Sequence, residues 1–235
     1  MHCVMNPESQ KEFMIRMFNV GKRYPGKVAL EDICLDVRAG EFIFITGPSG
    51  AGKSTLLKVL YMAETITQGQ ILIDGMNLAR VSRSRLPFLR RRFGMVFQDF
   101  RLIPSRTVYD NVALVLEVAG EKPAQIRKKV MQTLKVCGMV DKANAFPPTL
   151  SGGEQQRVAV ARAVVGEPSV ILADEPTGSL DAAAAQKVMD LLTFYHGRGA
   201  TILMVSHNLD FPDFHVRARN IALNQGRLVS TATIL

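Results

Sequence analysis

The chain has 235 residues, of which 47% are hydrophobic and 21% charged, and a formal net charge of +8. This composition predicts one globular domain with a full hydrophobic core and excludes a disordered chain. No apolar run approaches the roughly 18 residues of a membrane-spanning helix, so we expect no membrane span.

Strand-like and helix-like segments alternate along the chain. The patterns predict strands at Met14–Asn19, Ile33–Val37, Phe42–Thr46, Gln70–Ile73, Gly94–Gln98, Val170–Ala173, Thr201–Ser206 and Asn220–Leu223. They predict helices at Lys53–Met62, Val108–Val118, Pro123–Cys137, Gly152–Val165 and Ala182–Tyr195. This alternation is typical of an α/β domain with a mainly parallel sheet. Turn signals at Ala39-Gly40 and Asp74-Gly75 predict that the early strands also include an antiparallel β layer.

A phosphate-binding loop follows the apolar strand Phe42–Thr46 and opens a helix. Its residues, Gly47-Pro48-Ser49-Gly50-Ala51-Gly52-Lys53-Ser54, match the pattern G-x-x-x-x-G-K-S. The glycines let backbone N–H groups curl around phosphate oxygens, and the helix N-terminus adds its dipole. Lys53 supplies positive charge to the β- and γ-phosphates, and the Ser54 hydroxyl is a ligand for Mg²⁺. We therefore expect a nucleoside triphosphate here, with Thr55 completing the nucleotide-binding set.

The densest basic cluster comes next and comprises Arg80, Arg83, Arg85, Arg90, Arg91 and Arg92. A solvated helix face and a membrane-proximal surface are both compatible with it. Nucleic-acid binding is the weakest interpretation, because no helix-turn-helix, zinc-finger or aromatic ribonucleoprotein motif accompanies the cluster. We therefore expect no nucleic-acid partner.

From Val108 to Gly166 the pattern is helical throughout. It predicts a helical subdomain of about residues 99–166 inserted into the α/β core. We expect the domain to span residues 14–235, after a flexible N-terminal tail over residues 1–13. The Val108–Val118 helix is apolar on nearly every side, so core packing and docking of a partner are both open interpretations.

Two adjacent carboxylates end the buried strand that begins near Val170. Asp174 stands at the strand end, where it can hold Mg²⁺ directly or through water. Glu175 points differently and can polarise an attacking water. The alternative interpretation is that these two carboxylates belong to an ordinary acidic turn. The phosphate-binding loop in the same chain favours the catalytic interpretation.

A third motif, Leu150-Ser151-Gly152-Gly153-Glu154-Gln155-Gln156-Arg157, begins a long helix. Ser151 is a good N-cap, and the two glycines permit close backbone approach, so this helix N-terminus is a second anion site. With the two nucleotide motifs, the segment resembles the signature of the ABC ATPase family, although Glu154 stands where many members have Gln. The resemblance implies a P-loop NTPase core and a head-to-tail homodimer, in which each signature binds the γ-phosphate of ATP held by the other subunit.

Further positions are similar to functional residues of that family. The resemblance implies that Tyr24 stacks on adenine, that Gln98 reaches Mg²⁺ and the attacking water, and that His207 contacts the γ-phosphate. Ser179-Leu180-Asp181 is similar to the loop that crosses to the partner subunit, with Ser179 where relatives often have Asn. The implied activity is hydrolysis of ATP, with catalytic Lys53, Gln98, Glu175 and His207, and with Mg²⁺ held by Ser54, Gln98 and Asp174.

Within the family, Val96–Ile103 and Arg106–Val112 are most similar to the cell-division branch, the FtsE proteins. The resemblance implies a peripheral protein at the cytoplasmic face of the bacterial inner membrane. Its partner would be an integral membrane protein like FtsX, and the complex would control cell-wall hydrolysis. The alternative is the ATPase of a lipoprotein-release or macrolide-efflux transporter. A nucleic-acid ABC protein would need a coiled-coil insert, zinc motifs or a second nucleotide domain, and Glu175 and His207 argue against a non-hydrolysing scaffold.

Overall fold

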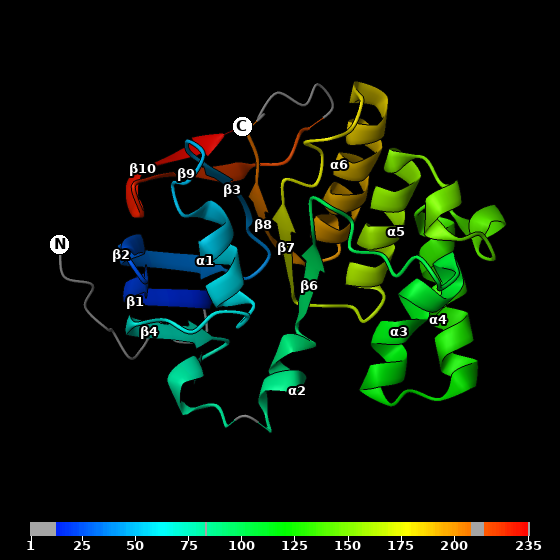
Figure 1. Ribbon diagram of the computed structural model, residues 1–235, viewed down its shortest axis with the longest axis horizontal. Helices are drawn as coiled ribbons and strands as arrows, with labels where there is room; N and C mark the ends of the chain where they lie inside the picture. Colours follow the sequence, from blue (N-terminus) through cyan, green and yellow to red (C-terminus); the bar gives the residue numbers. More distant parts are fainter. Residues whose placement is uncertain (1–12, 83, 208–213, 235) are drawn as a thin grey trace.

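A six-stranded sheet runs through the centre of the computed structural model (Figure 1), which describes residues 13–82, 84–207 and 214–234. The strand order is β10-β9-β3-β8-β7-β6. The strands are β3 (Phe42–Thr46), β6 (Phe93–Val96), β7 (Val170–Asp174), β8 (Thr201–Val205), β9 (Ala218–Asn224) and β10 (Arg227–Ile234). All neighbours pair in parallel except β9 and β10, which are antiparallel, so the expected mainly parallel sheet is confirmed.

A second, antiparallel sheet lies beside the first, as predicted. Its order is β2-β1-β4-β5. The strands are β1 (Phe13–Tyr24), β2 (Lys27–Arg38), β4 (Gln68–Ile73) and β5 (Met76–Asn77). Asp74 and Gly75 form the turn between β4 and β5 with positive φ angles of 48° and 74°. The Ala39-Gly40 turn leads instead from β2 into β3 of the central sheet.

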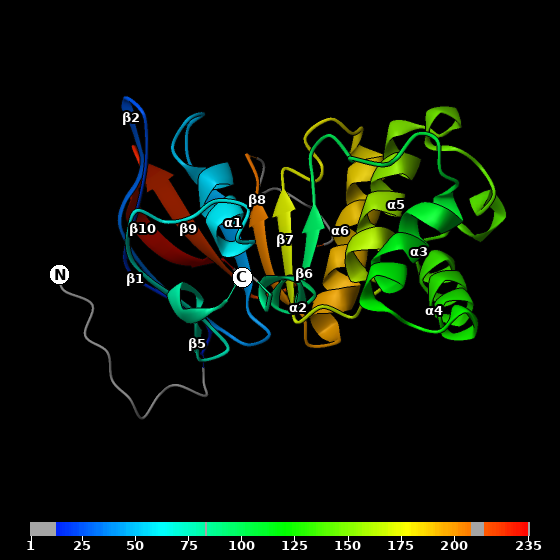
Figure 2. The same ribbon diagram turned by 60° about the horizontal axis from the view of Figure 1, so that its bottom comes forward.

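Alternation along β3 divides the hydrophobic core in two. Phe42 and Phe44 face the core shared with the helices of residues 108–197, and Ile43 and Ile45 face the core shared with the antiparallel sheet. A strand buried on both faces explains the uninterrupted apolar run in the sequence. Helix α1 (Lys53–Leu60) lies between the two sheets, and α5 (Gly152–Val164) and α6 (Ala182–Gly197) cover the other face of the central sheet (Figure 2). The phosphate-binding loop, which joins β3 to α1, is therefore anchored by both cores.

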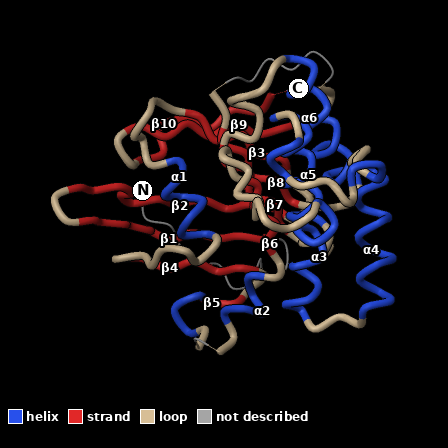
Figure 3. The backbone as a smooth tube through the Cα atoms, turned by 45° about the vertical axis from the view of Figure 1, so that its right-hand side comes forward, coloured by secondary structure: helices blue, strands red, loops and turns tan. Residues whose placement is uncertain are grey.

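The four longest helices gather at one side of the molecule (Figure 3). They are α3 (Val108–Ala119), α4 (Pro123–Val136), α5 (Gly152–Val164) and α6 (Ala182–Gly197). Thr107 and Asp110 form a capping box at the start of α3. The buried Asn111 side chain accepts from Ile103 N–H and donates to the carbonyls of Ile103, Arg106 and Thr107. Local hydrogen bonding thus accounts for Thr107, Asp110 and Asn111 in the Arg106–Val112 run.

The short helix α2 (Leu86–Arg90) and the strands β5 and β10 were not predicted. Three arginines of the basic cluster hold the α2 region in place. Arg90 donates to the Met62 carbonyl, Arg91 donates to the Val118 carbonyl, and Arg92 pairs with Asp74. Arg83 lies outside the described residues, as does the expected tail up to residue 12, and Phe13 is the first residue of β1. No described helix has the length and apolarity to cross a membrane.

Candidate functional site

The phosphate-binding loop has a shape that two of its glycines make possible. Gly47 has a φ of 139° and Gly52 has a φ of 105°. A Cβ atom on Gly47 would lie 2.0 Å from the Leu223 carbonyl oxygen, and one on Gly52 would lie 2.4 Å from the Ala29 carbonyl oxygen. Backbone atoms of β9 and β2 thus pack against the outside of the loop at these two glycines. This packing fixes the curved backbone of Pro48, Ser49, Gly50 and Ala51 between them.

Lys53 is the first residue of α1 and its side chain folds back into the loop. Its ammonium group donates to the carbonyls of Gly47, at 2.7 Å, and Pro48, at 3.0 Å. The residue is only 6% exposed. No side chain caps the N-terminus of α1, so the first N–H groups of this helix are available to an anion. Ser54 and Thr55 follow within the same first turn.

Ser54 and Asp174 meet although 120 residues separate them in the chain. The Ser54 hydroxyl donates to Asp174 Oδ1 at 3.2 Å. Burial raises the pKa of Asp174, with the neighbouring Glu175 adding to the increase and the Ser54 hydrogen bond opposing it. A hydroxyl and a carboxylate are hard oxygen donors of the kind Mg²⁺ prefers, and this ion commonly keeps several waters. These residues therefore fit the metal that was expected here.

Glu175 turns away from Asp174 because its backbone is in the left-handed region, with a φ of 48°. Its N–H donates to the Val205 carbonyl at 3.0 Å, which fixes the turn against β8. One carboxylate oxygen lies 2.9 Å from His207 Nε2. The Glu175 side chain is mostly buried, whereas that of His207 is 53% exposed. The two side chains that were predicted to act on the terminal phosphate and the water are thus in direct contact.

Gln98 and Tyr24 were also predicted to act at this site. The strand expected over Gly94–Gln98 ends at Val96, so Gln98 belongs to a turn and is exposed. Tyr24 ends β1, with its ring 4.7 Å from the Lys22 ammonium group. Neither side chain makes a hydrogen bond to the phosphate-binding loop among the described residues.

The signature segment begins α5 as predicted. Ser151 is the N-cap, and its hydroxyl accepts from Glu154 N–H at 3.3 Å while the Glu154 carboxylate accepts from Ser151 N–H at 2.8 Å. The backbone hydrogen bond from Ser151 lowers the pKa of Glu154. Either Glu or Gln supplies the oxygen for such a capping box, which explains the residue at this position. A Cβ atom on Gly153 would lie 2.8 Å from Ala184 Cβ, so this glycine permits the close packing of α5 on α6.

An open pocket of about 460 Å³ lies in front of the signature segment. Ser151, Gly152 and Gly153 line it together with Asp181, which caps α6 by accepting from Ala184 N–H at 2.7 Å. Arg157 and Lys187 add positive charge to the same pocket. Within the described ranges, no hydrogen bond or ion pair joins Ser151–Gly153 to the phosphate-binding loop. The predicted site residues therefore form two groups in one chain.

Two further residues connect these groups, and the sequence patterns gave no prediction for them. Gln156 of α5 donates to the Pro176 carbonyl at 2.7 Å, next to Glu175. Arg162 of the same helix donates to the carbonyls of Phe100 and Arg101, close to Gln98. For Gln156 the available signal was a polar residue on the apolar side of its helix, and for Arg162 the helical pattern gave none.

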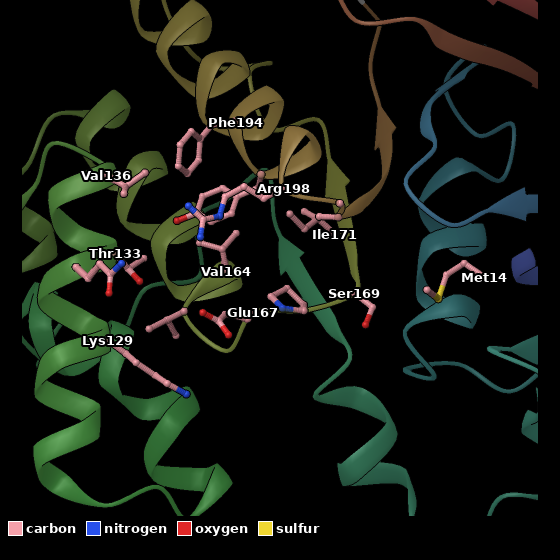
Figure 4. Close-up of a pocket in the computed structure, with 16 residues that line it drawn as sticks. Met14, Lys129, Thr133, Val136, Val164, Glu167, Ser169, Ile171, Phe194 and Arg198 are labelled. Atoms are coloured by element: carbon pink, nitrogen blue, oxygen red, sulfur yellow. The ribbon is translucent and has the colours of Figure 1, made fainter.

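A pocket of about 510 Å³ opens between α4, the end of α5 and the end of α6 (Figure 4). Lys129 and Val136 come from α4, and Phe194 and Arg198 lie on the opposite wall. Burial raises the pKa of Cys137, which follows α4, to about 12, so this thiol stays protonated at neutral pH. None of the predicted site residues lines this pocket.

Comparisons with known proteins agree with the geometry. Residues 30–178 match the ABC transporter family. The cell division ATP-binding protein FtsE of Bacillus subtilis (strain 168) is 46% identical over 217 residues, which cover 92% of this chain and 95% of that protein. FtsE of Escherichia coli (strain K12) is 47% identical over 198 residues, covering 84% and 89%. The dimeric ATP-binding cassette MJ0796 bound to ADP and Pi has a TM-score of 0.85 and 36% identity, covering 93% and 98%.

Proposed function

Because the chain belongs to the ABC transporter family, we propose that it is the ATP-hydrolysing subunit of a membrane complex that acts in bacterial cell division. Identity of 46% to an FtsE protein, over nearly the full length of both chains, is the observation that carries the cell-division part. The family match over residues 30–178 includes the phosphate-binding loop, Gln98, the signature segment and the Asp174-Glu175 pair.

The loop between β3 and α1 binds ATP. The Lys53 ammonium, which now donates to the Gly47 and Pro48 carbonyls, supplies positive charge to the β- and γ-phosphates. The free N–H groups of α1 and the Lys53 charge then neutralise the polyphosphate. Ser54 and Asp174, with Gln98 as a further expected ligand, would hold Mg²⁺, which would supply positive charge to the phosphates. Tyr24 stacks on the adenine.

Hydrolysis takes place at the end of β7. The Glu175 carboxylate accepts a proton from water as the water oxygen forms its bond to the γ-phosphorus, and the bond from that phosphorus to the ADP oxygen breaks. His207 orients Glu175 through the 2.9 Å contact and can then turn toward the phosphate. A second protomer supplies Ser151 and its glycines from its own pocket, with Asp181 at the rim. Two ATP molecules are then enclosed between two copies of the chain.

The output is transmitted to an integral membrane partner of the FtsX type, which controls cell-wall hydrolysis. The protein is then peripheral, at the cytoplasmic face of the inner membrane, through that partner. The exposed Val118 at the end of α3 and the exposed Phe88 of α2 lie on elements that Arg91 joins, and they offer apolar surface for docking.

Two experiments test the proposal at its two levels. Glu175→Gln keeps the phosphate-binding loop and removes the proton acceptor, so with ATP it should elute from size-exclusion chromatography as a dimer. A monomer under those conditions contradicts the enclosed-ATP arrangement.

Co-purification from the native membrane identifies the partner. A protein with four membrane spans and a modest external domain supports cell division, whereas a large periplasmic domain contradicts it in favour of efflux or lipoprotein release.

A further inference from the structure

The loop from Phe97 to Arg101 carries Gln98 and is attached to α5 at both ends. At its start, Gln156 Nε2 lies 3.5 Å from the Phe97 carbonyl oxygen. At its end, Arg162 donates to the Phe100 carbonyl at 2.8 Å and to the Arg101 carbonyl at 2.5 Å. Any movement of α5 along or across its axis therefore displaces both ends of the loop together.

The end of the loop has a strained backbone that Arg162 supports. Phe100 and Arg101 have φ angles of 58° and 49°, a region that costs a non-glycine residue about 1 kcal/mol or more. Their two carbonyls are the ones that the guanidinium group binds. Arg101 itself packs on the Phe97 ring at 4.2 Å and pairs with Asp99 at 3.1 Å. Those two contacts shape the loop internally but do not attach it to the helix.

Gln156 is not explained by stability alone. The residue is 0% exposed, and its Oε1 atom has no hydrogen-bond partner among the described residues. Leaving such an atom unpaired costs about 1–3 kcal/mol, which a hydrophobic residue of similar size avoids. Its Nε2 donates to the Pro176 carbonyl at 2.7 Å, next to Glu175, and also faces Phe97, next to Gln98. The buried Gln156 amide thus contacts both segments that carry the side chains expected to act on the attacking water, Gln98 and Glu175.

The N-terminus of α5 is exposed at the surface. Ser151 caps α5 five residues before Gln156 and lines the signature pocket, whose ligand in the proposed dimer is the nucleotide of the partner. We propose that Gln156 and Arg162 are positioning residues. Through them, the position of α5 against the partner's ATP determines where Gln98 and Glu175 lie in the protomer's own site. The two nucleotide sites of a dimer are then coupled through α5. This inference rests on the proposed function, because it assigns the signature pocket to the partner's nucleotide.

Double-mutant analysis on the purified full-length protein tests the coupling. The variants are Arg162→Ala, Arg162→Lys and Gln156→Met, each alone and combined with Gln98→Ala, with Arg127→Ala on the exposed side of α4 as the matched control. For Arg162→Ala and Gln156→Met we expect kcat for ATP hydrolysis to fall by about tenfold or more, with ATP affinity within about threefold of the parent. Arg162→Lys should retain part of the rate, since an ammonium group still reaches one carbonyl. Arg127→Ala should leave both quantities unchanged.

The decisive comparison is with the Gln98→Ala background. Because the Arg162 side chain binds carbonyls of this loop, Arg162→Ala combined with Gln98→Ala should be no slower than Gln98→Ala alone, whereas losses that multiply overturn the inference. Unchanged kcat in both Arg162→Ala and Gln156→Met also overturns it. Should Arg162→Ala fail to fold, Arg162→Lys, which preserves the charge, decides the matter by the same comparison. Normal hydrolysis in Gln98→Ala, with a slow Arg162→Ala, overturns the coupling while leaving the ATPase proposal intact.

Discussion

Substitution of Ser151 by alanine separates a structural role of this residue from a role at the partner's nucleotide. The variant loses the hydroxyl that accepts from Glu154 N–H at 3.3 Å, but it keeps the 2.8 Å bond from Ser151 N–H to the Glu154 carboxylate. Half of the capping box therefore survives, and the cost in folding free energy should be about 0.5–1 kcal/mol. For a chain of this size that lowers Tm by roughly 1–4 °C. Hydrolysis should fall by about tenfold or more, because a preorganised donor to the terminal phosphate is lost.

Mixing Ser151→Ala with Glu175→Gln protein before adding ATP identifies which subunit uses the serine. In a mixed dimer one centre has both defects and the other has neither, because Ser151 of one chain serves the Glu175 of the other. Random mixing makes about half of the dimers mixed, so roughly a quarter of the parent rate should return. Phosphate release from ATP measures it, with each variant alone as the control. A mixture no faster than the sum of its components refutes the shared-site reasoning.

The remaining predictions concern single protomers. Lys53→Ala should weaken ATP binding at least about a hundredfold in calorimetric titration, while Lys58→Ala, on the exposed side of the same helix, should bind normally; equal affinities would contradict the assigned role of Lys53. Gly47→Ala should lower the free energy of unfolding in urea by roughly 2 kcal/mol or more, because its Cβ meets the Leu223 carbonyl, whereas Gly50→Ala, with open space around it, should cost about 1 kcal/mol. Because burial raises the pKa of Asp174 above 3.8, ionising it opposes folding; Asp174→Asn should therefore raise Tm at pH 7 and abolish Mg²⁺-dependent hydrolysis. The gain in Tm should shrink as pH falls through the raised pKa, and a gain independent of pH would show another cause.

Most of the candidate site residues could be predicted from the sequence, because they belong to motifs of contiguous residues. The phosphate-binding loop, the signature and the Asp174-Glu175 pair each lie next to a strand or helix whose apolar pattern is visible in the sequence. Parallel strands place their carboxyl ends at one edge of a sheet, so the meeting of Ser54 with Asp174 followed from the pattern. Gln98 was assigned its role from resemblance, and its exposed position after β6 leaves that role a prediction.

Contacts between distant segments could not be predicted. Arg162 reaches the Phe100 and Arg101 carbonyls across about 60 residues, and nothing in its helical pattern distinguishes it from a solvated arginine. Gly153 looks like a phosphate-approach glycine, yet its Cβ position is filled by Ala184 of α6. The strand β10 was missed because its polar Ser230-Thr231 stretch gives no buried pattern, and its pairing with β9 supplies the stability instead.

The sequence alone determined the α/β class and the antiparallel layer and predicted the nucleotide-binding residues, because these depend on periodicity and on motifs of a few neighbouring residues. The tertiary structure alone decided that Glu175 rests on His207, that the signature pocket is separate from the phosphate-binding loop of the same chain, and that α5 ties the two groups together. The physical reason is that such contacts depend on how helices pack against a sheet, and packing geometry is set by every element at once.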